Sequence, residues 1–311
     1  MRYKLYIVLL YMSSGLLNIA DKGKNTFGDF SSNKYISGTK DFLNSNSIVA
    51  KLAFLVLIII LFAVLLRIGT SILSWIFAPS ANPILINGMI DAKQMIRIPQ
   101  DPSINGAIPI LRSKNADEGI VFTWSVWINI DDLVYRKGEF KHIFHKGNDD
   151  INVTTPPIGV NQPNNAPGLY IAPGTNDLVV LMNTFEVINE EIIIKDIPLN
   201  KWLNVIIRVD AQHILDVYIN GRLTKRHILK GVPKQNYGDV YVSMNGGFSG
   251  YTSSLRYFDS AIGTNQIQSI VDKGPSLNML GSSSSISEKN KTNDFLSLKW
   301  YFNGNGDMYN S

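Results

Sequence analysis

The chain has 311 residues, a formal net charge of +4 at pH 7 and no cysteine. The lack of cysteine excludes disulfide bonds, thiolate metal ligands and a cysteine nucleophile. The basic residues are scattered and form no Lys/Arg stripe with interleaved aromatics, so we predict no nucleic-acid partner. The length allows one large β domain with an appendage, or two modest domains.

Residues 1–47 are expected to form a polar N-terminal tail whose first 20 residues resemble a signal segment. A basic start, an apolar run over residues 5–12 and the small residue Ala20 fit a signal peptide. Ser13, Ser14 and Gly15 interrupt the run. The sequence leaves two alternatives open, a second membrane segment and a translation start at Met12.

The next segment is predicted to be a single transmembrane helix over residues 48–77. Leu52 to Leu66 are fifteen consecutive uncharged apolar residues, and about 20 residues cross ~30 Å of hydrocarbon. Arg67 would cost roughly 2.5 to 3.5 kcal/mol at a helix centre, but it can extend toward an interface, and the apolar run outweighs it. The first expected partner is therefore the lipid bilayer.

The charges that flank this helix predict its orientation. The N-terminal flank holds Lys22, Lys24, Lys34, Lys40 and Lys51, whereas Arg67 is the last basic residue before Lys93. The positive-inside tendency then keeps the N-terminal side cytoplasmic and displays the C-terminal part on the extracytoplasmic side. A cleaved signal peptide would reverse this orientation.

A linker over residues 78–94 is expected to lead into a domain over residues 95–311 built from short strands. In the run 120–130, Phe122, Trp124, Val126, Ile128 and Ile130 alternate and share one face. The stretch 201–229 predicts a three-stranded meander in which Asn220-Gly221 forms a two-residue turn with positive φ. Regularly spaced strands of this kind predict an all-β fold, a two-sheet antiparallel β-sandwich or jelly roll.

One helix and a loop are expected near the C-terminus. Residues 263–274 suit a short helix with Thr264 as N-cap and Gly274 as its end. Residues 281–294 are rich in serine and predict a flexible loop. A last strand is expected over residues 295–302.

Several motifs carry a family resemblance. In order, "FTWSVWI", "PGLYIAPGTNDLVVLMN", "KWLNVIIRVDAQHILDVYINGRL" and "GGFSGYTSSLRYFDSAIGTNQIQSIV" resemble the laminin-G-like branch of the concanavalin A-like lectin/glucanase superfamily, over residues 119–274. The resemblance implies a concanavalin A-like sandwich. The arrangement of the whole chain, with "KWYFNGNGD" near its end, also resembles membrane-anchored proteins of large DNA viruses, which implies a virion or host membrane.

The residues favour a non-enzymatic protein. Glu186, Glu190 and Glu191 lack the alternating carboxylates of a glucanase strand, and Glu190 and Glu191 should face opposite sides. His142 and His145 are three apart in a strand, so they too should face opposite sides and bind no metal. A glycoside hydrolase remains the catalytic alternative.

The first of two hypothetical binding sites is a calcium site. Asp149, Asp150 and Asp177 lie in Asn/Asp-rich loops that would suit Ca²⁺, or that are ordinary turns.

Five further residues are candidates for binding a glycan or protein ligand: Asn245, Phe248, Tyr251, Asn165 and Tyr170. Aromatic faces beside amides suit sugars, and the alternative is that Phe248 and Tyr251 pack a sandwich edge while the neighbouring glycines make a bend. The resulting prediction is a membrane-anchored binding protein with a lectin-like sandwich, with a structural membrane protein of a viral particle that binds no sugar as the alternative.

Overall fold

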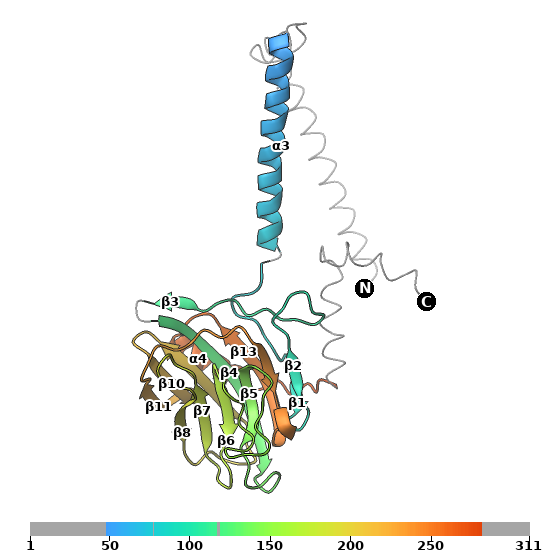
Figure 1. Ribbon diagram of the computed structural model, residues 1–311. Coiled ribbons are helices and arrows are strands. Elements are labelled where there is room, and N and C mark those ends of the chain that lie inside the picture. The colour runs from blue at the N-terminus through green and yellow to red at the C-terminus, as the bar shows by residue number, and fades with distance from the viewer. Residues whose placement is uncertain (1–47, 77, 117–118, 282–311) are drawn as a thin grey trace, which may run out of the picture. The chain divides into compact units, whose positions relative to one another are not determined.

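The computed structural model describes residues 48–76, 78–116 and 119–281 (Figure 1). They divide into one unit that ends at Ala78 and a second that begins at Pro79. The predicted tail 1–47 with its signal-like start, the loop 281–294 beyond Gly281 and the last strand 295–302 lie outside the described residues.

The first unit contains the helix α3, Ile48–Ile76, whose 29 residues correspond to a length of about 43 Å. None of its apolar span is buried in protein, and among the described residues it is the one helix long and apolar enough to cross a membrane. An apolar surface all round a helix requires an apolar surrounding. The predicted orientation of the helix stays a prediction.

The second unit is a sandwich of two antiparallel sheets (Figure 1). Sheet A has the order β1 (Met89–Asp91), β13 (Ser249–Phe258), β4 (Gly119–Asp132), β9 (Leu203–Asp210), β10 (Ile214–Ile219) and β11 (Arg222–Ile228), with β3 (Lys114–Ala116) beside β4. Sheet B has the order β2 (Ile96–Ile98), β12 (Asp239–Val242), β5 (Lys141–Gly147), β6 (Gly168–Ile171), β7 (Leu178–Met182) and β8 (Glu190–Ile194). The predicted all-β sandwich preceded by one apolar helix is confirmed.

The core lies between the sheets and follows the predicted alternation. All five alternating residues of β4, from Phe122 to Ile130, are buried in one cluster. Trp124 stacks on Phe144 of sheet B with ring centroids 5.3 Å apart, and its edge meets Tyr257 at 5.1 Å. Such aromatic pairs contribute about 0.5 to 1.5 kcal/mol beyond their buried area, so Trp124 joins both sheets.

The predicted meander is also confirmed. β9, β10 and β11 pair antiparallel in sequence order. Asn220 and Gly221 both have positive φ, 48° and 79°, which a two-residue hairpin turn requires.

The short helix α4, Thr264–Lys273, packs on the outer face of sheet A, where Ile267 contacts a cluster with Ile206 and Phe258. The predicted N-cap is wrong by one residue, because Gly263 occupies that position and Thr264 is already helical. Gly274 ends the helix with a φ of 70°, a conformation that favours glycine.

The predicted boundary between linker and sandwich at residue 95 is wrong. Leu85, Ile86 and Ile90 are buried in the main core, and β1 pairs with β13. The partner strand lies about 160 residues away in the chain (Met89 pairs with Ser253), and local patterns do not show such distant pairing. The sandwich therefore begins within the predicted linker.

The chain enters the sandwich at one defined end. The Asp259 N–H donates to Ala81 O at 3.2 Å, just beyond the end of β13. We call this end of the sandwich the entry end. β4 also begins there, since Thr123 near its start pairs with Phe258 at the end of β13. The opposite end holds the end of β4, where Asp132 pairs with Ser249.

Candidate functional site

The first group of predicted ligand-binding residues does not form an exposed aromatic platform. Phe248 is fully buried in the main core, so its ring offers no face to a ligand and that prediction is wrong. Asn245 lies at the opposite end of the sandwich and donates to Glu139 Oε2 at 3.4 Å. Tyr251 is half-buried and pairs with Asn129 on β4.

Asn165 and Tyr170, the second group of predicted ligand-binding residues, bond other residues of the protein. Tyr170 is fully buried and its hydroxyl donates to Asn165 Oδ1 at 2.5 Å. Asn165 Nδ2 in turn donates to Asn161 O and Asn189 Oδ1 at 2.7 and 2.8 Å. Buried polar groups need such partners, and these contacts hold the loop between β5 and β6 in place. Neither Asn165 nor Tyr170 is accessible to a ligand.

The predicted calcium residues are not brought together. Asp149 and Asp150 follow the end of β5, whereas Asp177 precedes β7 at the other end of that sheet. Asp177 Oδ1 accepts the Asp196 N–H at 3.1 Å, as a turn residue does. Among the described residues, no group of three or more His, Asp or Glu side chains could hold a metal ion.

The two histidines of β5 do form a pair, contrary to the prediction from strand alternation. A bulge between His142 and Phe144 shifts the register of β5, and an extra residue reverses the faces that follow it. His142 Nε2 and His145 Nδ1 are 2.6 Å apart. Because the Met244 N–H donates to His142 Nδ1 at 3.1 Å, His142 Nε2 must be the donor to His145, whose Nε2 donates to Asn148 O at 2.7 Å.

This histidine pair is neutral. Burial lowers the pKa of His145 to about 4, against weaker raising effects of the hydrogen bond to Asn148 O and of the Asp149 carboxylate. Burial, followed by the neighbouring His145, lowers the pKa of His142 well below its usual value. The pair connects the segment at Met244 with the loop that begins at Asn148, so its contacts are structural.

The carboxylates considered for hydrolysis are separated as predicted. In β8, Glu190 is buried and Glu191 is exposed, so they face opposite sides. Glu190 Oε1 accepts from His227 Nε2 at 2.8 Å and its carboxylate also accepts the Lys230 N–H. His227 on β11 is therefore paired with Glu190 on β8.

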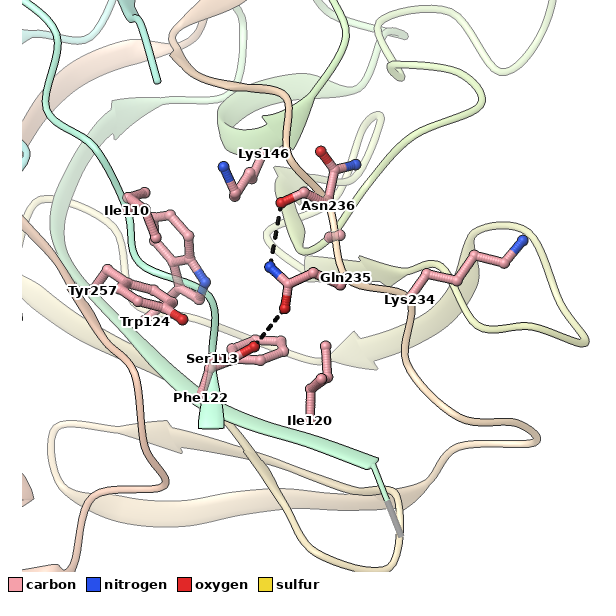
Figure 2. Close-up of a pocket in the computed structure, with 11 residues that line it drawn as sticks. Ile110, Ser113, Ile120, Phe122, Trp124, Lys146, Lys234, Gln235, Asn236 and Tyr257 are labelled. Carbon is pink, nitrogen blue, oxygen red and sulfur yellow. Dashed lines mark hydrogen bonds between the residues drawn. The ribbon is translucent and has the colours of Figure 1, made fainter. Parts of the chain in front are cut away.

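A cavity between the sheets at the entry end is too small for an organic ligand. Its volume is about 10 Å³, room for about one water molecule. Figure 2 shows Gln235 between Ser113, which donates to Gln235 Oε1 at 2.7 Å, and Asn236. Lys146 points into this region and donates to Gly238 O at 2.6 Å, and burial lowers its pKa to about 8.

A larger pocket on the outer face of sheet A has the features of a ligand site. Its volume is about 230 Å³, and we call it the outer-sheet pocket. Its lining combines an indole, two cations, hydroxyls and an amide: Trp127, Arg256, Lys273, Ser254, Ser276 and Asn87, with Ile84 and Ile270. None of the described residues that line it is a carboxylate.

The cations of the outer-sheet pocket have no carboxylate partner among the described side chains. Arg256 Nε is buried without a hydrogen-bond partner, and the guanidinium lies 5.1 Å from the ring centroid of Phe258. Lys273 is exposed in the last turn of α4. A buried donor without a partner is costly, and a ligand acceptor would remove that cost.

A bulge in β13 builds this pocket. The register shifts between Ser253 and Arg256, and Ser254 in between has a φ of 51°. A left-handed conformation at a residue other than glycine costs of order 1 to 3 kcal/mol. The segment after α4 closes the pocket, because Ser253 Oγ donates to Ser276 O at 2.8 Å.

The sequence analysis did not predict this pocket, although the sequence contains one partial indication of it. Alternation along β4 places Trp127 on the face opposite Trp124, and an aromatic on the outer face of a strand is unusual enough to mark. The pairing that brings Arg256 beside it spans more than a hundred residues. A larger hollow of about 480 Å³ lies at Phe140 and Pro157, and the described residues that line it are apolar or glycine, which do not orient a polar ligand.

Comparisons with known proteins show no family for the chain. No family model matches it, and no curated protein matches it. Among solved structures it is similar to the receptor binding domain of botulinum neurotoxin C/D mosaic serotype, at 12% identity and a TM-score of 0.39, over 49% of this chain and 36% of that one. The receptor binding domain of botulinum neurotoxin D matches at 15% identity and 0.39, over 54% and 40%.

A third structure, the binding domain of botulinum neurotoxin DC in complex with rat synaptotagmin II, matches at 17% identity and a TM-score of 0.38, over 49% of this chain and 35% of that one. The chain thus spans well under half the length of these structures. At TM-scores this low, no function is transferred from the likeness, and the architecture of the sandwich rests on its own strand pairing.

Proposed function

We propose that the chain is a membrane-anchored, non-enzymatic binding protein whose sandwich recognises an acidic glycan at the outer-sheet pocket. The observation that carries this proposal is the pair of cations, Arg256 and Lys273, that share a 230 Å³ pocket with Trp127 and have no carboxylate partner among the described residues. The helix α3 supplies the anchor.

The chemistry of the pocket selects the ligand class. A guanidinium and an ammonium favour a carboxylate or sulfate group. Hydroxyl and amide groups of Ser254, Ser276 and Asn87 can bond sugar hydroxyls, and the indole of Trp127 supplies apolar surface. The volume suits one acidic sugar unit at the end of a chain. Since none of the described residues that line the pocket is a carboxylate, we expect binding without calcium.

The test is glycan binding by the full chain in lipid nanodiscs. An array pairs sialylated, uronic-acid and sulfated glycans with neutral counterparts, with Ca²⁺ and again with chelator. We expect acidic glycans to bind in both conditions. Losing a charge-assisted hydrogen bond costs about 1.5 to 3 kcal/mol, so Arg256→Gln should weaken binding by roughly 10-fold to 100-fold.

Matched variants show whether binding depends on the pocket cations or on surface charge in general. Lys273→Gln, at an exposed position, should also weaken binding, whereas Lys195→Gln, an exposed lysine beyond β8, should not. Equal binding of acidic and neutral glycans, or unchanged binding in both pocket variants, would refute the acidic-glycan proposal. Binding abolished by chelator would favour a calcium lectin and direct attention to Asp149.

The alternative is a structural membrane protein without sugar binding, and a folded chain that binds no glycan in the array would support it. Location in a virion membrane, which the sequence resemblance implies, belongs to the same proposal, and detection of the chain in purified particles tests it. A glycoside hydrolase is the remaining catalytic alternative, tested by release of reducing sugar.

A further inference from the structure

Two paired loops at the entry end expose large apolar side chains. Residues 183–189 and 229–238 are joined by a bridge between Thr184 and Pro233 and by the Phe185 N–H, which donates to Val232 O at 3.0 Å. Three side chains on them are mostly exposed: Phe185 at 70%, Ile188 at 63% and Tyr237 at 73%. Single exposed apolar residues are ordinary, but three on two adjoining loops need an explanation.

The loops belong to the end at which the chain enters the sandwich. Gly119, the first residue of β4, lies against Val232 and Pro233. β3, beside β4, begins at Lys114, whose N–H donates to Asp259 O, and Asp259 in turn bonds Ala81. These contacts connect the exposed loops to Ala81, whose carbonyl accepts the Asp259 N–H just beyond the end of β13.

The chain between the apolar helix and this end is short. The helix ends at Ile76, and Ala81 is already hydrogen-bonded to the sandwich. Five residues span at most about 18 Å when fully extended. The helix, about 43 Å long, exceeds the ~30 Å hydrocarbon thickness, so its last turn with Trp75 is at interfacial depth when it spans. The entry end is thereby tethered close to lipid headgroups.

The chemistry of the two loops suits that surrounding. Tyrosine is enriched at membrane interfaces, and phenylalanine and isoleucine insert into the boundary between headgroups and acyl chains. Lys234 Nζ lies 5.5 Å from the ring centroid of Phe185, and Figure 2 shows its side chain directed away from the inter-sheet cavity. The loops carry two lysines, Lys230 and Lys234, and one glutamate, Glu186, which suits phosphate groups.

We propose that these loops form a membrane-docking surface that inserts Phe185, Ile188 and Tyr237 into the bilayer interface. This inference rests on the proposed membrane anchoring. Docking would hold the sandwich in one orientation on the bilayer, whereas an undocked sandwich would reorient about the segment that joins it to the helix. It also directs the opposite end, with Asn245 and Val134, away from the lipid.

The test uses the lack of cysteine in the chain. Full-length Glu186→Cys, which keeps Phe185 and Ile188, is labelled with an environment-sensitive fluorophore and reconstituted in phosphatidylcholine vesicles that carry nitroxide-labelled headgroups. The matched control is Lys137→Cys, an exposed position at the opposite end beside Val134, which is 77% exposed. Leu61→Cys with nitroxide deep in the acyl chains reports on the anchor.

We expect headgroup nitroxide to quench the label at residue 186 and not at residue 137. Replacing Phe185 and Ile188 together by serine should remove that quenching. Equal quenching at 186 and 137, or quenching that survives the double replacement, would overturn the docking proposal while leaving the anchor intact. An unquenched label at residue 61 would overturn the anchoring itself, and with it both proposals.

Discussion

Acid should destabilise the sandwich through the buried histidine pair on β5. In the folded chain His142 Nδ1 accepts the Met244 N–H, and His145 Nε2 donates to Asn148 O. A proton added to His142 Nδ1 would remove that acceptor, and a charge on either ring would be buried. Tyr170 and Tyr241, the aromatic neighbours of the pair, carry no charge that compensates.

The size of the effect follows from the pKa of His145. It falls from 6.5 when unfolded to about 4 when folded, which corresponds to about 3 kcal/mol. Between these pH values the unfolded chain binds more protons than the folded chain, so stability rises with pH and falls on acidification. His142, whose pKa is also lowered, adds a loss of the same sign. Together the two should cost more than 3 kcal/mol of the typical ~5 to 15 kcal/mol of a domain.

The assay is chemical unfolding of the full chain in nanodiscs at a series of pH values from 7.5 to 4, followed by tryptophan fluorescence. Trp124, stacked on Phe144 in the core, reports loss of packing. The double variant His142→Gln, His145→Gln should be less stable at pH 7.5 but should lose less stability on acidification. Ile143→Val, a core change on the same strand that costs about 0.5 to 1.5 kcal/mol, should keep the wild-type pH dependence.

Two results would refute this reasoning. One is a wild-type chain whose unfolding free energy does not change between pH 6.5 and 4.5. The other is a double variant with the same pH dependence as the wild type, because the slope would then come from other groups. Asp132 adds little to the slope between pH 6.5 and 4.5. Hydrogen bonds from the Tyr135 N–H, Ser249 and the Val134 N–H lower its pKa from 3.8, so its contribution is lost as the pH falls through that value and below.

Three further changes have expected effects on stability, each measured by the same unfolding assay. Lys141→Met should stabilise the sandwich by about 1 to 3 kcal/mol, because Lys141 is fully buried, no described residue bonds its Nζ and burial lowers its pKa. A loss of stability would mean that the ammonium has a partner. Gly221→Ala should cost about 1 to 2 kcal/mol, because its φ is 79° and a Cβ would lie 3.3 Å from Val271 Cγ2; an unchanged midpoint would contradict the hairpin geometry. Phe248→Ala should lower the free energy of unfolding by about 3 to 5 kcal/mol, because the side chain is buried in the core. A small change would mean that Phe248 lies on the surface.

The sequence by itself determined those features that depend on neighbours along the chain. The apolar run from Leu52 to Leu66 produced a helix long enough to span a membrane, alternation along β4 separated Trp124 from Trp127, and Asn220-Gly221 produced the hairpin turn. Each follows from local sterics or from one repeating period, so each could be predicted.

Only the tertiary structure decided what the faces of those strands contact. A bulge in β5 brought His142 and His145 together, and a bulge in β13 placed Ser254 and Arg256 in one pocket with Trp127. A bulge is one extra residue whose position depends on the partner strand, here β6 for β5 and the distant β4 for β13. For the same reason Phe248 and Tyr170, which look suited to a ligand in the sequence, are buried by segments that only the folded sandwich brings over them.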